Sequence, residues 1–259
     1  MDGRNDGNNM GNGKNYAAGI LPVCVSQDGE VWVLLGLQPK GAGKAECMLV
    51  AKDAKSRVEG VWCVFWGWQD KGDLDEEDTA AREAEEESSG LLGTREELRK
   101  FLLSNPQCRI LPCLHAVFCG VLSSDEMSAV EDEFYWLRWH TTGLSMNRRE
   151  MACVKWFCLK DLEAALQSGS NVLKGMTHSK QKLRKFLYQW LLRAVNVFSN
   201  DPLMISLRNG RANSVAVYSH LVQNVIPCGL CGAKLLNSER KFRSGRCNSC
   251  YDKEKRTTS

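Results

Sequence analysis

The chain has 259 residues, of which 43% are hydrophobic and 25% are charged. These fractions are close to the averages of globular proteins, so they exclude a wholly disordered chain, and the length predicts one ordinary domain plus a smaller module. The sequence has no run of 18 apolar residues, which excludes a conventional membrane-spanning helix and a membrane partner. The N-terminal residues lack the apolar stretch of a secretory signal, so we expect an intracellular protein, cytoplasmic or nuclear, that is not secreted.

Charge is distributed unevenly along the chain. The net charge is only +3, yet residues 171–211 carry eight Lys or Arg against one Asp, and residues 228–259 carry eight against three acids. The first 170 residues are therefore acidic, with a net charge of −9. A basic C-terminal half is compatible with a polyanionic partner such as RNA, whereas the plain alternative is a solvated basic surface.

The first two thirds of the chain predict a strand-rich, mixed α/β domain over residues 16–170. Before it, residues 1–15 are rich in Asn and Gly, which predicts a disordered tail. Residues 18–25 and 31–35 predict two strands, joined by a hairpin turn with an Asp-Gly step. The further elements expected in chain order are an ill-defined connection at 41–57, a strand at 61–66, helices at 75–87 and 94–103, strands at 110–121, 133–140 and 152–159, and a short helix at 160–167.

A basic amphipathic segment follows this domain. In residues 179–198 the apolar side chains recur at helical spacing, while basic side chains crowd the start. We expect an amphipathic helix there, within a basic extension and linker that covers residues 171–226. Its apolar stripe is more typical of a face that docks on the neighbouring domain than of a membrane or partner face.

An acidic helix is the strongest candidate for chemistry in the first domain. Glu83, Glu86 and Glu87 stand at i, i+3 and i+4, so their carboxylates share one side of a helix. Mg²⁺ and Mn²⁺ prefer hard oxygen ligands of this kind, together with waters and substrate phosphates. Arg82 can pair with one of the carboxylates and orient it. Taken alone, such a triplet more often belongs to a solvated acidic helix.

The surroundings of this triplet favour the functional interpretation. Residues 67–90 resemble the signature of the Nudix hydrolase superfamily, a loop-helix-loop written Gx5Ex7REUxEExGU, in which U is an apolar residue. Residues 82–87 match the REUxEE core at every position. The resemblance covers about residues 16–167, because the opening strands and a late strand of such domains are also matched, at residues 18–23, 33–36 and 150–157.

The chain departs from the signature in two places. Gly67 is followed at the expected interval by Asp73 instead of Glu, and eight residues separate Asp73 from Arg82 where the family has seven. Two serines, rather than one residue, stand before Gly90. Both differences lie in loop or helix-end positions, where insertions are tolerated.

The resemblance implies a β-sheet domain flanked by helices that acts as a pyrophosphatase. Its substrate would be a nucleoside diphosphate linked to another moiety, or a related organic pyrophosphate. Glu83, Glu86 and Glu87 would hold Mg²⁺ or Mn²⁺, and Arg82 would orient one of them. The general base differs among members of the superfamily, so Glu150 or one of the three glutamates is the candidate for that role.

Substrate identity stays open at this point. Trp66, Trp68 and Trp136 are candidates for stacking a nucleobase, although most tryptophans are expected in the core. Capped RNA, a dinucleoside polyphosphate, a nucleotide sugar and a diphosphoinositol are all compatible with the sequence, which also leaves the oligomeric state open. The alternative function is a catalytically weak Nudix-fold binding protein in an RNA or protein assembly. The irregular loop favours this alternative, whereas three mutually repelling glutamates favour the enzyme.

Residues 227–251 carry a second metal-binding pattern. Cys228, Cys231, Cys247 and Cys250 form two C-x2-C pairs with fifteen residues between them, which is the spacing of a four-thiolate zinc site. Thiolates at this spacing reach one ion through a tight turn. So small a segment has few apolar groups, so we expect a zinc ribbon or knuckle whose folding depends on structural Zn²⁺.

The zinc segment and the basic tail at residues 252–259 are compatible with nucleic-acid contacts. Lys and Arg with interleaved aromatic residues suit an RNA backbone and its bases. Docking on a protein partner is the rival interpretation. The cysteines outside the zinc pattern that we expect to be small core residues are Cys24, Cys63, Cys113, Cys119, Cys153 and Cys158.

Overall fold

The computed structural model describes residues 16–39, 59–140, 150–170, 172, 181–184, 205–207, 209–210, 216–218, 220, 225–227 and 234–236. The strands are β1 (Ala17–Ser26), β2 (Val31–Pro39), β3 (Gly60–Cys63), β4 (Phe65–Trp68), β5 (Arg109–Leu111), β6 (Leu114–Leu122), β7 (Cys153–Cys158), β8 (Gln181–Leu183), β9 (Val225–Pro227) and β10 (Lys234–Leu236). The helices are α1 (Glu76–Glu87), α2 (Arg95–Ser104), the short 3₁₀ helix η3 (Pro106–Cys108), α3 (Ser124–His140) and α4 (Leu159–Gln167). They form a mixed α/β fold with one eight-stranded mixed sheet and a separate two-stranded sheet.

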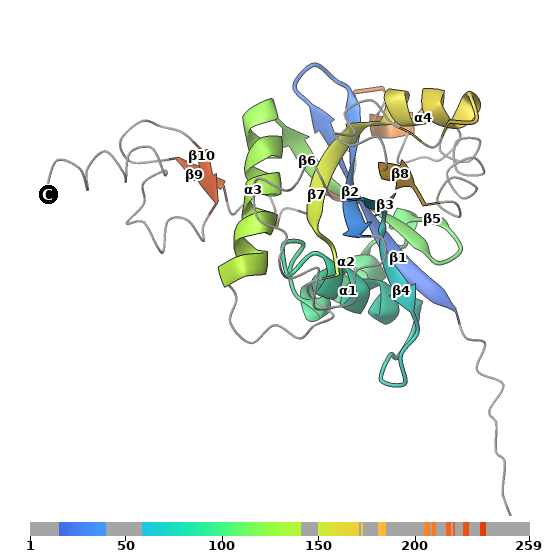
Figure 1. Cartoon of the computed structure of the whole chain (residues 1–259). Helices are drawn as coiled ribbons and strands as arrows, with labels where there is room; N and C mark the ends of the chain where they lie inside the picture. Colours follow the sequence, from blue (N-terminus) through green and yellow to red (C-terminus); the bar gives the residue numbers. More distant parts are fainter. Residues whose placement is uncertain are drawn as a thin grey trace, which may run out of the picture.

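In the large sheet, two neighbouring strands separate and pair with different partners at their far ends. Its strand order is β5-β6-β1-β2-β3-β8, with β4 paired to β1 and β7 paired to β2. β1 runs parallel to β6 and antiparallel to β2 and β4. β3 and β4 are two halves of one strand, broken at Val64, and they pair with different partners, β3 with β2 and β4 with β1. β1 and β2 therefore diverge beyond their shared hairpin (Figure 1).

The hairpin predicted at the start of the domain is confirmed. β1 and β2 pair antiparallel, with Val23 opposite Val33. In the turn, the Gly29 amide donates to the Ser26 carbonyl at 2.9 Å. Gly29 has φ of +85°, a left-handed conformation that glycine adopts without a steric penalty. The Asp-Gly step thus fixes the register of β1 and β2, which are the central strands of the sheet.

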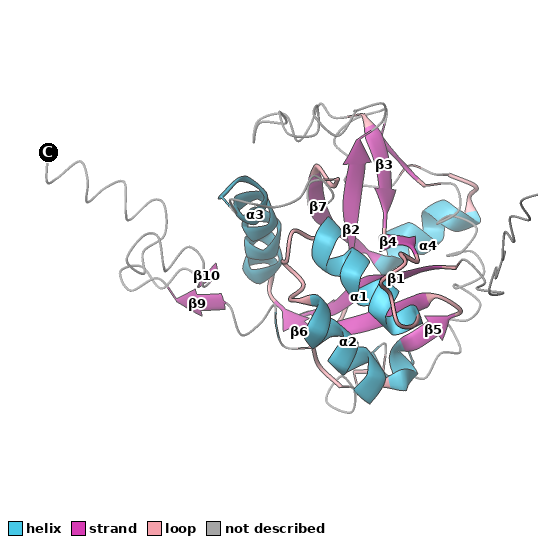
Figure 2. Cartoon of the chain, turned by 90° about the horizontal axis from the view of Figure 1, so that it is seen from below, coloured by secondary structure: helices cyan, strands magenta, loops and turns pink. Residues whose placement is uncertain are grey.

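The sheet is covered by helices on both faces. Side chains alternate along each strand, so in β1 Ile20 and Cys24 enter one core while Leu21 and Val23 enter the other. α1, α2 and α3 bury residues in the first core, and α4 buries residues in the second. Seen from below, α1 and α2 lie side by side across the sheet (Figure 2).

The two helices predicted in the acidic region are confirmed, and each begins at a side-chain cap. The Asp75 carboxylate accepts a hydrogen bond from the Asp78 amide at the start of α1. Thr94 and Glu97 form the reciprocal capping box expected for α2. After α1 the chain turns at Gly90, which has φ of +80°. The strand predicted at 152–159 and the short helix predicted after it are also confirmed, as β7 and α4.

The strand predicted at residues 133–140 is wrong, because these residues belong to α3. The aromatic composition of the segment is typical of a strand, but a capping box starts a helix upstream of it. The Ser123 hydroxyl accepts from the Glu126 amide, and the Glu126 carboxylate accepts from the Ser123 amide at 2.7 Å. Val130 and Phe134 are both fully buried at helical spacing. Helical packing on the sheet therefore overrides the local preference.

Three further expectations need correction. Residues 181–183 lie within the amphipathic helix predicted at 179–198, but they form β8, which pairs in parallel with β3. The strand predicted at 61–66 is divided into β3 and β4. The strand predicted at 110–121 is divided into β5 and β6 around Cys113, which has φ of +67°. Periodicity alone marks neither the strand pairing of residues 181–183 nor the breaks at Val64 and Cys113.

Several expectations concern parts of the chain that the structure does not describe. These parts are the N-terminal tail 1–15, the connection 41–57, residues 179–180 and 185–198 of the predicted amphipathic helix, the cysteines Cys228, Cys231, Cys247 and Cys250, and the tail 252–259. Among the described residues, none of the helices combines the length and the hydrophobicity of a membrane-spanning segment. The expected core cysteines are buried at Cys24, Cys63, Cys119 and Cys153, and half-buried at Cys113 and Cys158.

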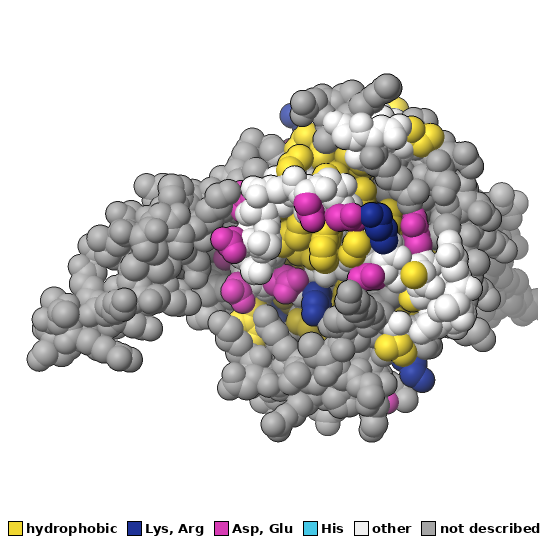
Figure 3. Space-filling model, turned by 90° about the horizontal axis from the view of Figure 1, so that it is seen from above, with side chains coloured by type: hydrophobic (Ala, Val, Ile, Leu, Met, Phe, Trp, Pro, Cys, Tyr) yellow, Lys and Arg dark blue, Asp and Glu magenta, His cyan; other side chains and the backbone are white. Residues whose placement is uncertain are grey.

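The upper face of the molecule carries a hollow that contains none of the predicted site residues. Seen from above, hydrophobic side chains gather at the centre of this face and acidic side chains lie around them (Figure 3). A cavity of about 530 Å³ lies between the β1–β2 turn, the start of α3, and β7, and its lining includes Trp32, Met127, Glu131 and Trp156. The predicted catalytic residues lie elsewhere, beside α1.

Candidate functional site

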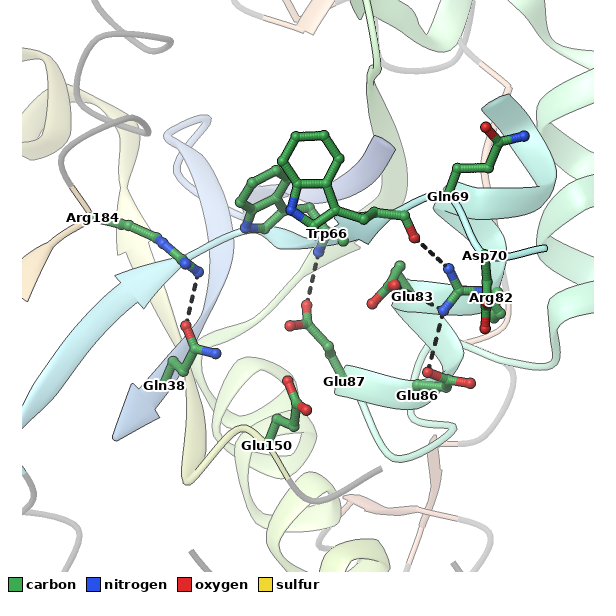
Figure 4. Close-up of a pocket in the computed structure, with 12 residues that line it drawn as sticks. Gln38, Trp66, Gln69, Asp70, Arg82, Glu83, Glu86, Glu87, Glu150 and Arg184 are labelled. Carbon is green, nitrogen blue, oxygen red and sulfur yellow. Dashed lines mark hydrogen bonds and ion pairs between the residues drawn. The ribbon is translucent and has the colours of Figure 1, made fainter. Parts of the chain in front are cut away.

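One pocket of about 440 Å³ collects all five residues predicted for catalysis (Figure 4). It lies beside α1 and β4, and it also receives residues from the end of β2, from the segment before β7 and from the position after β8. Its lining residues are Gln38, Trp66, Gly67, Trp68, Gln69, Asp70, Arg82, Glu83, Glu86, Glu87, Glu150 and Arg184. The fold thus brings Glu150, which is distant in sequence, to the glutamates of α1.

α1 presents its glutamates to the pocket because its opposite face is buried. Ala80, Ala81 and Ala84 are fully buried against the sheet, where small side chains let the helix approach closely. Glu87 follows Ala80 and Ala84 along nearly the same face, so its side chain is drawn to the sheet, and the residue is only 5% exposed. The positions of the alanines and glutamates along α1 therefore determine how deeply each carboxylate is buried.

Glu83 is seated against a glycine of β4. A Cβ atom added to Gly67 would lie 2.2 Å from the carboxyl carbon of Glu83, so only glycine leaves room for this carboxylate. The Glu83 Oε1 atom accepts from Arg82 Nη1 at 2.7 Å. Burial raises the pKa of Glu83 above its ordinary value, and the opposing charge of Arg82 offsets only part of this effect.

Glu87 is fixed by the backbone of the same strand. Its Oε2 atom accepts a hydrogen bond from the Trp66 amide at 2.7 Å. Burial, followed by the charge of Glu83, raises the pKa of Glu87 well above its ordinary value. Glu86 is more accessible, and its carboxylate lies 3.4 Å from Arg82 Nη1. The three carboxylates therefore share a pocket but differ in burial and in partners.

Arg82 is the organising cation of this region. Its Nε atom donates to Asp73 at 2.9 Å, and its Nη2 atom donates to the Trp68 carbonyl at 2.8 Å. Burial would lower the pKa of Arg82, but the hydrogen bonds to Asp73 and the charge of Glu83 outweigh it and raise the pKa. Asp73, which stands where the signature has Glu, is thus hydrogen-bonded to Arg82.

A second arginine, Arg95, binds carboxylates of α1 and of the loop that precedes it. Arg95 donates to both carboxylate oxygens of Asp78 at 2.6 Å, and its Nη2 atom also contacts Asp73 at 3.1 Å. Asp78 accepts the Leu74 amide as well, at 2.9 Å. The hydrogen bonds from Arg95 are the main cause that lowers the pKa of Asp78, against the opposing effect of burial. This network connects the loop that contains the extra residue to α1 and α2.

We expect Asp78→Asn to lower the free energy of unfolding by about 2 kcal/mol at pH 7, because it weakens a buried, charge-assisted pair. A lowered folded-state pKa gives stability that is present above the unfolded pKa of about 3.9 and is lost as the pH falls through the folded value. The difference between the two proteins should therefore shrink below about pH 4. Chemical denaturation at a series of pH values measures it.

The control for this variant is Asp125→Asn, which removes an exposed carboxylate from the first turn of α3. It should change the free energy of unfolding by about 0.5 kcal/mol or less. A destabilisation by Asp78→Asn that stays constant as the pH falls well below the unfolded pKa would contradict the ion-pair assignment.

The pocket contains functional candidates that sequence reasoning missed. Arg184 follows β8, in a segment that was expected to be helical, and Gln38 lies near the end of β2. Only the parallel pairing of β8 with β3 brings Arg184 to the pocket, and no local motif marks it. Of the predicted stacking residues, Trp66 and Trp68 line the pocket. Trp136 lies on α3, and its side chain is outside the described part.

The donor set suits a hard divalent cation. Glu83, Glu86 and Glu87 offer only carboxylate oxygens, which Mg²⁺ and Mn²⁺ prefer, and Gly67 leaves a recess in which one carboxylate is already seated. In the described residues no three His, Cys, Asp or Glu side chains are already arranged around one metal position. Arg82 Nη1 lies 2.7 Å from a Glu83 oxygen and 3.4 Å from a Glu86 oxygen, and each carboxylate has further lone pairs that can bind a cation.

Comparisons with protein-family models, with curated proteins and with solved structures found no match for this chain. The interpretation of the pocket therefore depends on its own geometry and on the resemblance in residues 67–90. Both concern the same residues, since the segment that carries the resemblance supplies the glutamates and the glycine of the pocket.

Proposed function

We propose that this protein hydrolyses a nucleoside diphosphate-linked compound, or another organic pyrophosphate, with Mg²⁺ or Mn²⁺, and that its sheet domain has a Nudix-like fold. One observation carries the proposal. Four glutamates from two distant segments, Glu83, Glu86 and Glu87 of α1 and Glu150 before β7, line a single open pocket together with Arg184. Carboxylates that bind a metal, a cation and a base suit pyrophosphate hydrolysis. The negative charge on the phosphate oxygens must be neutralised while the attacking water is deprotonated.

The divalent cation, when bound by Glu83, Glu86 and Glu87, would supply charge neutralisation at the diphosphate. The residues of the chain provide the rest. The Trp66 amide holds the Glu87 carboxylate in place, and Arg82 keeps the Glu83 carboxylate against Gly67. Their fixed positions reduce the reorganisation that catalysis requires.

Glu150 is the proposed general base. It enters the pocket from the position before β7, and its charge contributes to the raised pKa of both Glu83 and Glu87. It is therefore close enough to interact with these carboxylates, yet it comes from a different element. A carboxylate in this position would accept a proton from the attacking water.

The proposal is tested by incubating the full chain with a library of organic pyrophosphates and Mg²⁺ or Mn²⁺, and by reading the products by mass spectrometry. We expect at least one compound to be cleaved at its diphosphate, and cleavage to stop when EDTA is added. Binding of library compounds without any cleavage would favour the alternative, a Nudix-fold protein that binds but does not hydrolyse.

A structural zinc site in residues 227–251 is a separate proposal. β9 and β10 form an antiparallel pair in which Pro227 lies opposite Lys234, so the pair brackets Cys228 and Cys231 in the chain. Each strand has three residues, and so short a ribbon is marginal in water without further support. Zn²⁺ held by the four thiolates would supply that support.

We expect protein prepared without chelator to contain about one zinc per chain, and Cys228→Ser to release it. Elemental analysis by mass spectrometry measures the metal content. Cys108→Ser, which alters a buried cysteine outside the pattern, should retain the zinc. Zinc-free protein, or equal zinc content in all three proteins, would refute the site.

A further inference from the structure

Arg184 lies at the end of the pocket that is opposite Arg82. Figure 4 shows Arg184 and Gln38 at one end, the Arg82 guanidinium at the other, and Glu87 between them. The proposed metal ligands therefore occupy the centre and one end of the pocket. A substrate whose diphosphate lies at these ligands can extend its remaining part toward Arg184.

Contacts with Trp62, Trp66 and Gln38 help to fix the position of Arg184. Its backbone amide donates to the Trp62 carbonyl at 3.0 Å, which continues the pairing of β8 with β3. Its guanidinium carbon lies 5.4 Å from the centre of the Trp66 ring, at cation–π distance. Its Nη1 atom donates to Gln38 Oε1 at 2.8 Å. The side chain is thus pre-organised, so binding an additional group costs little conformational entropy.

The charges along the pocket make this end the place for an anion. Besides Arg184, whose charge also acts on Glu87, the cation in the described lining is Arg82, whose guanidinium contacts Asp73 and Glu83. The other charged lining residues are carboxylates, which repel a phosphate unless a cation lies between them. A guanidinium presents several donors in a planar fork that matches the oxygens of a phosphate.

We infer that Arg184 is a specificity-determining residue that binds a further phosphate of the substrate, beyond the diphosphate that is cleaved. This inference rests on the proposed hydrolysis. It names nucleoside polyphosphates, which carry more than two phosphates in a row, as the substrate class. Nucleotide sugars with a neutral sugar place no charge at this end and are the poorer substrates.

The test compares two substrates that share their nucleosides and differ in phosphate number, diadenosine tetraphosphate and diadenosine diphosphate. Arg184→Met keeps an aliphatic side chain over Trp66 and removes the charge. We expect it to raise KM for the tetraphosphate at least tenfold, while kcat for the tetraphosphate and both constants for the diphosphate change less than twofold. Arg184→Lys, which keeps the charge without the fork, should give an intermediate KM.

The matched control is Lys182→Met, which removes a positive charge from an exposed position on β8, two residues before Arg184 and outside the pocket lining. It should leave both substrates unaffected. An equal rise in KM for the two substrates in Arg184→Met would overturn the inference, because it would show a general structural role.

A binding measurement separates this inference from the proposed function. Isothermal titration of the full chain with inorganic tripolyphosphate, in excess Mg²⁺, requires no turnover. At least tenfold weaker binding by Arg184→Met, with unchanged binding by Lys182→Met, would support the phosphate site even if no compound were hydrolysed. Equal binding by Arg184→Met, or no binding by the unmodified chain, would overturn the inference whatever the hydrolysis results.

Discussion

Glu86→Gln and Glu87→Gln should each lower kcat/KM for pyrophosphate hydrolysis by at least about 100-fold, because each removes a charged oxygen ligand from the proposed cation. Neither variant should lose its fold. The amide oxygen of Gln can still accept the Trp66 amide that Glu87 binds, and fewer carboxylates on α1 reduce the repulsion along the helix. Steady-state kinetics, with thermal unfolding measured in parallel, tests both statements.

Glu85→Gln is the matched control on the same helix. Glu85 accepts the Arg95 amide at 3.0 Å and does not line the pocket, and a glutamine keeps an acceptor for that bond. Its kcat/KM should stay within about twofold of the parent value. If Glu86→Gln and Glu87→Gln both retained activity within twofold as well, the assignment of metal ligands would be wrong.

Gly67→Ala should lower kcat/KM by at least about tenfold without altering any charged group. The new Cβ would lie 2.2 Å from the carboxyl carbon and Oε1 of Glu83, so the carboxylate must leave its recess. The end of a glutamate side chain moves at little cost, so the melting temperature should stay close to that of the parent. A displaced ligand costs catalysis because its position was organised before the substrate arrives.

Two other glycines separate this effect from general damage. Gly72→Ala places its Cβ in open space and should change neither activity nor stability appreciably. Gly19→Ala places its Cβ 2.4 Å from the Phe65 carbonyl oxygen and from the Trp66 Cβ, so β1 and β4 must shift and stability should fall. Full activity in Gly67→Ala would show that the position of Glu83 is unimportant for catalysis.

The sequence predicted the parts of the site that local patterns encode. The capped acidic helix placed Glu83, Glu86 and Glu87 on one side, and the structure has them in one pocket with Arg82. The irregular loop before the helix is also accommodated, because Asp73 contacts Arg82 directly. Caps, helical spacing and turn chemistry act over a few residues, so they can be recognised without tertiary information.

Long-range pairing explains what the sequence did not predict. Arg184 reaches the pocket because β8 pairs in parallel with β3, although its surroundings have the spacing of a helix. The converse holds for α3. Its aromatic residues are typical of a strand, but they belong to a helix that packs on the sheet. Periodicity shows which residues would share a face, and tertiary contacts decide whether the segment forms a helix or a strand.

The most direct test of the central claim is product analysis in ¹⁸O-labelled water. The full chain is incubated with the pyrophosphate library and Mg²⁺, and the masses of the phosphate products are compared with those from Glu86→Gln. The proposed mechanism predicts one ¹⁸O atom in one of the two phosphate products, with at least about 100-fold less product from Glu86→Gln. No labelled product from any compound, or equal labelled product from both proteins, would contradict hydrolysis at this pocket.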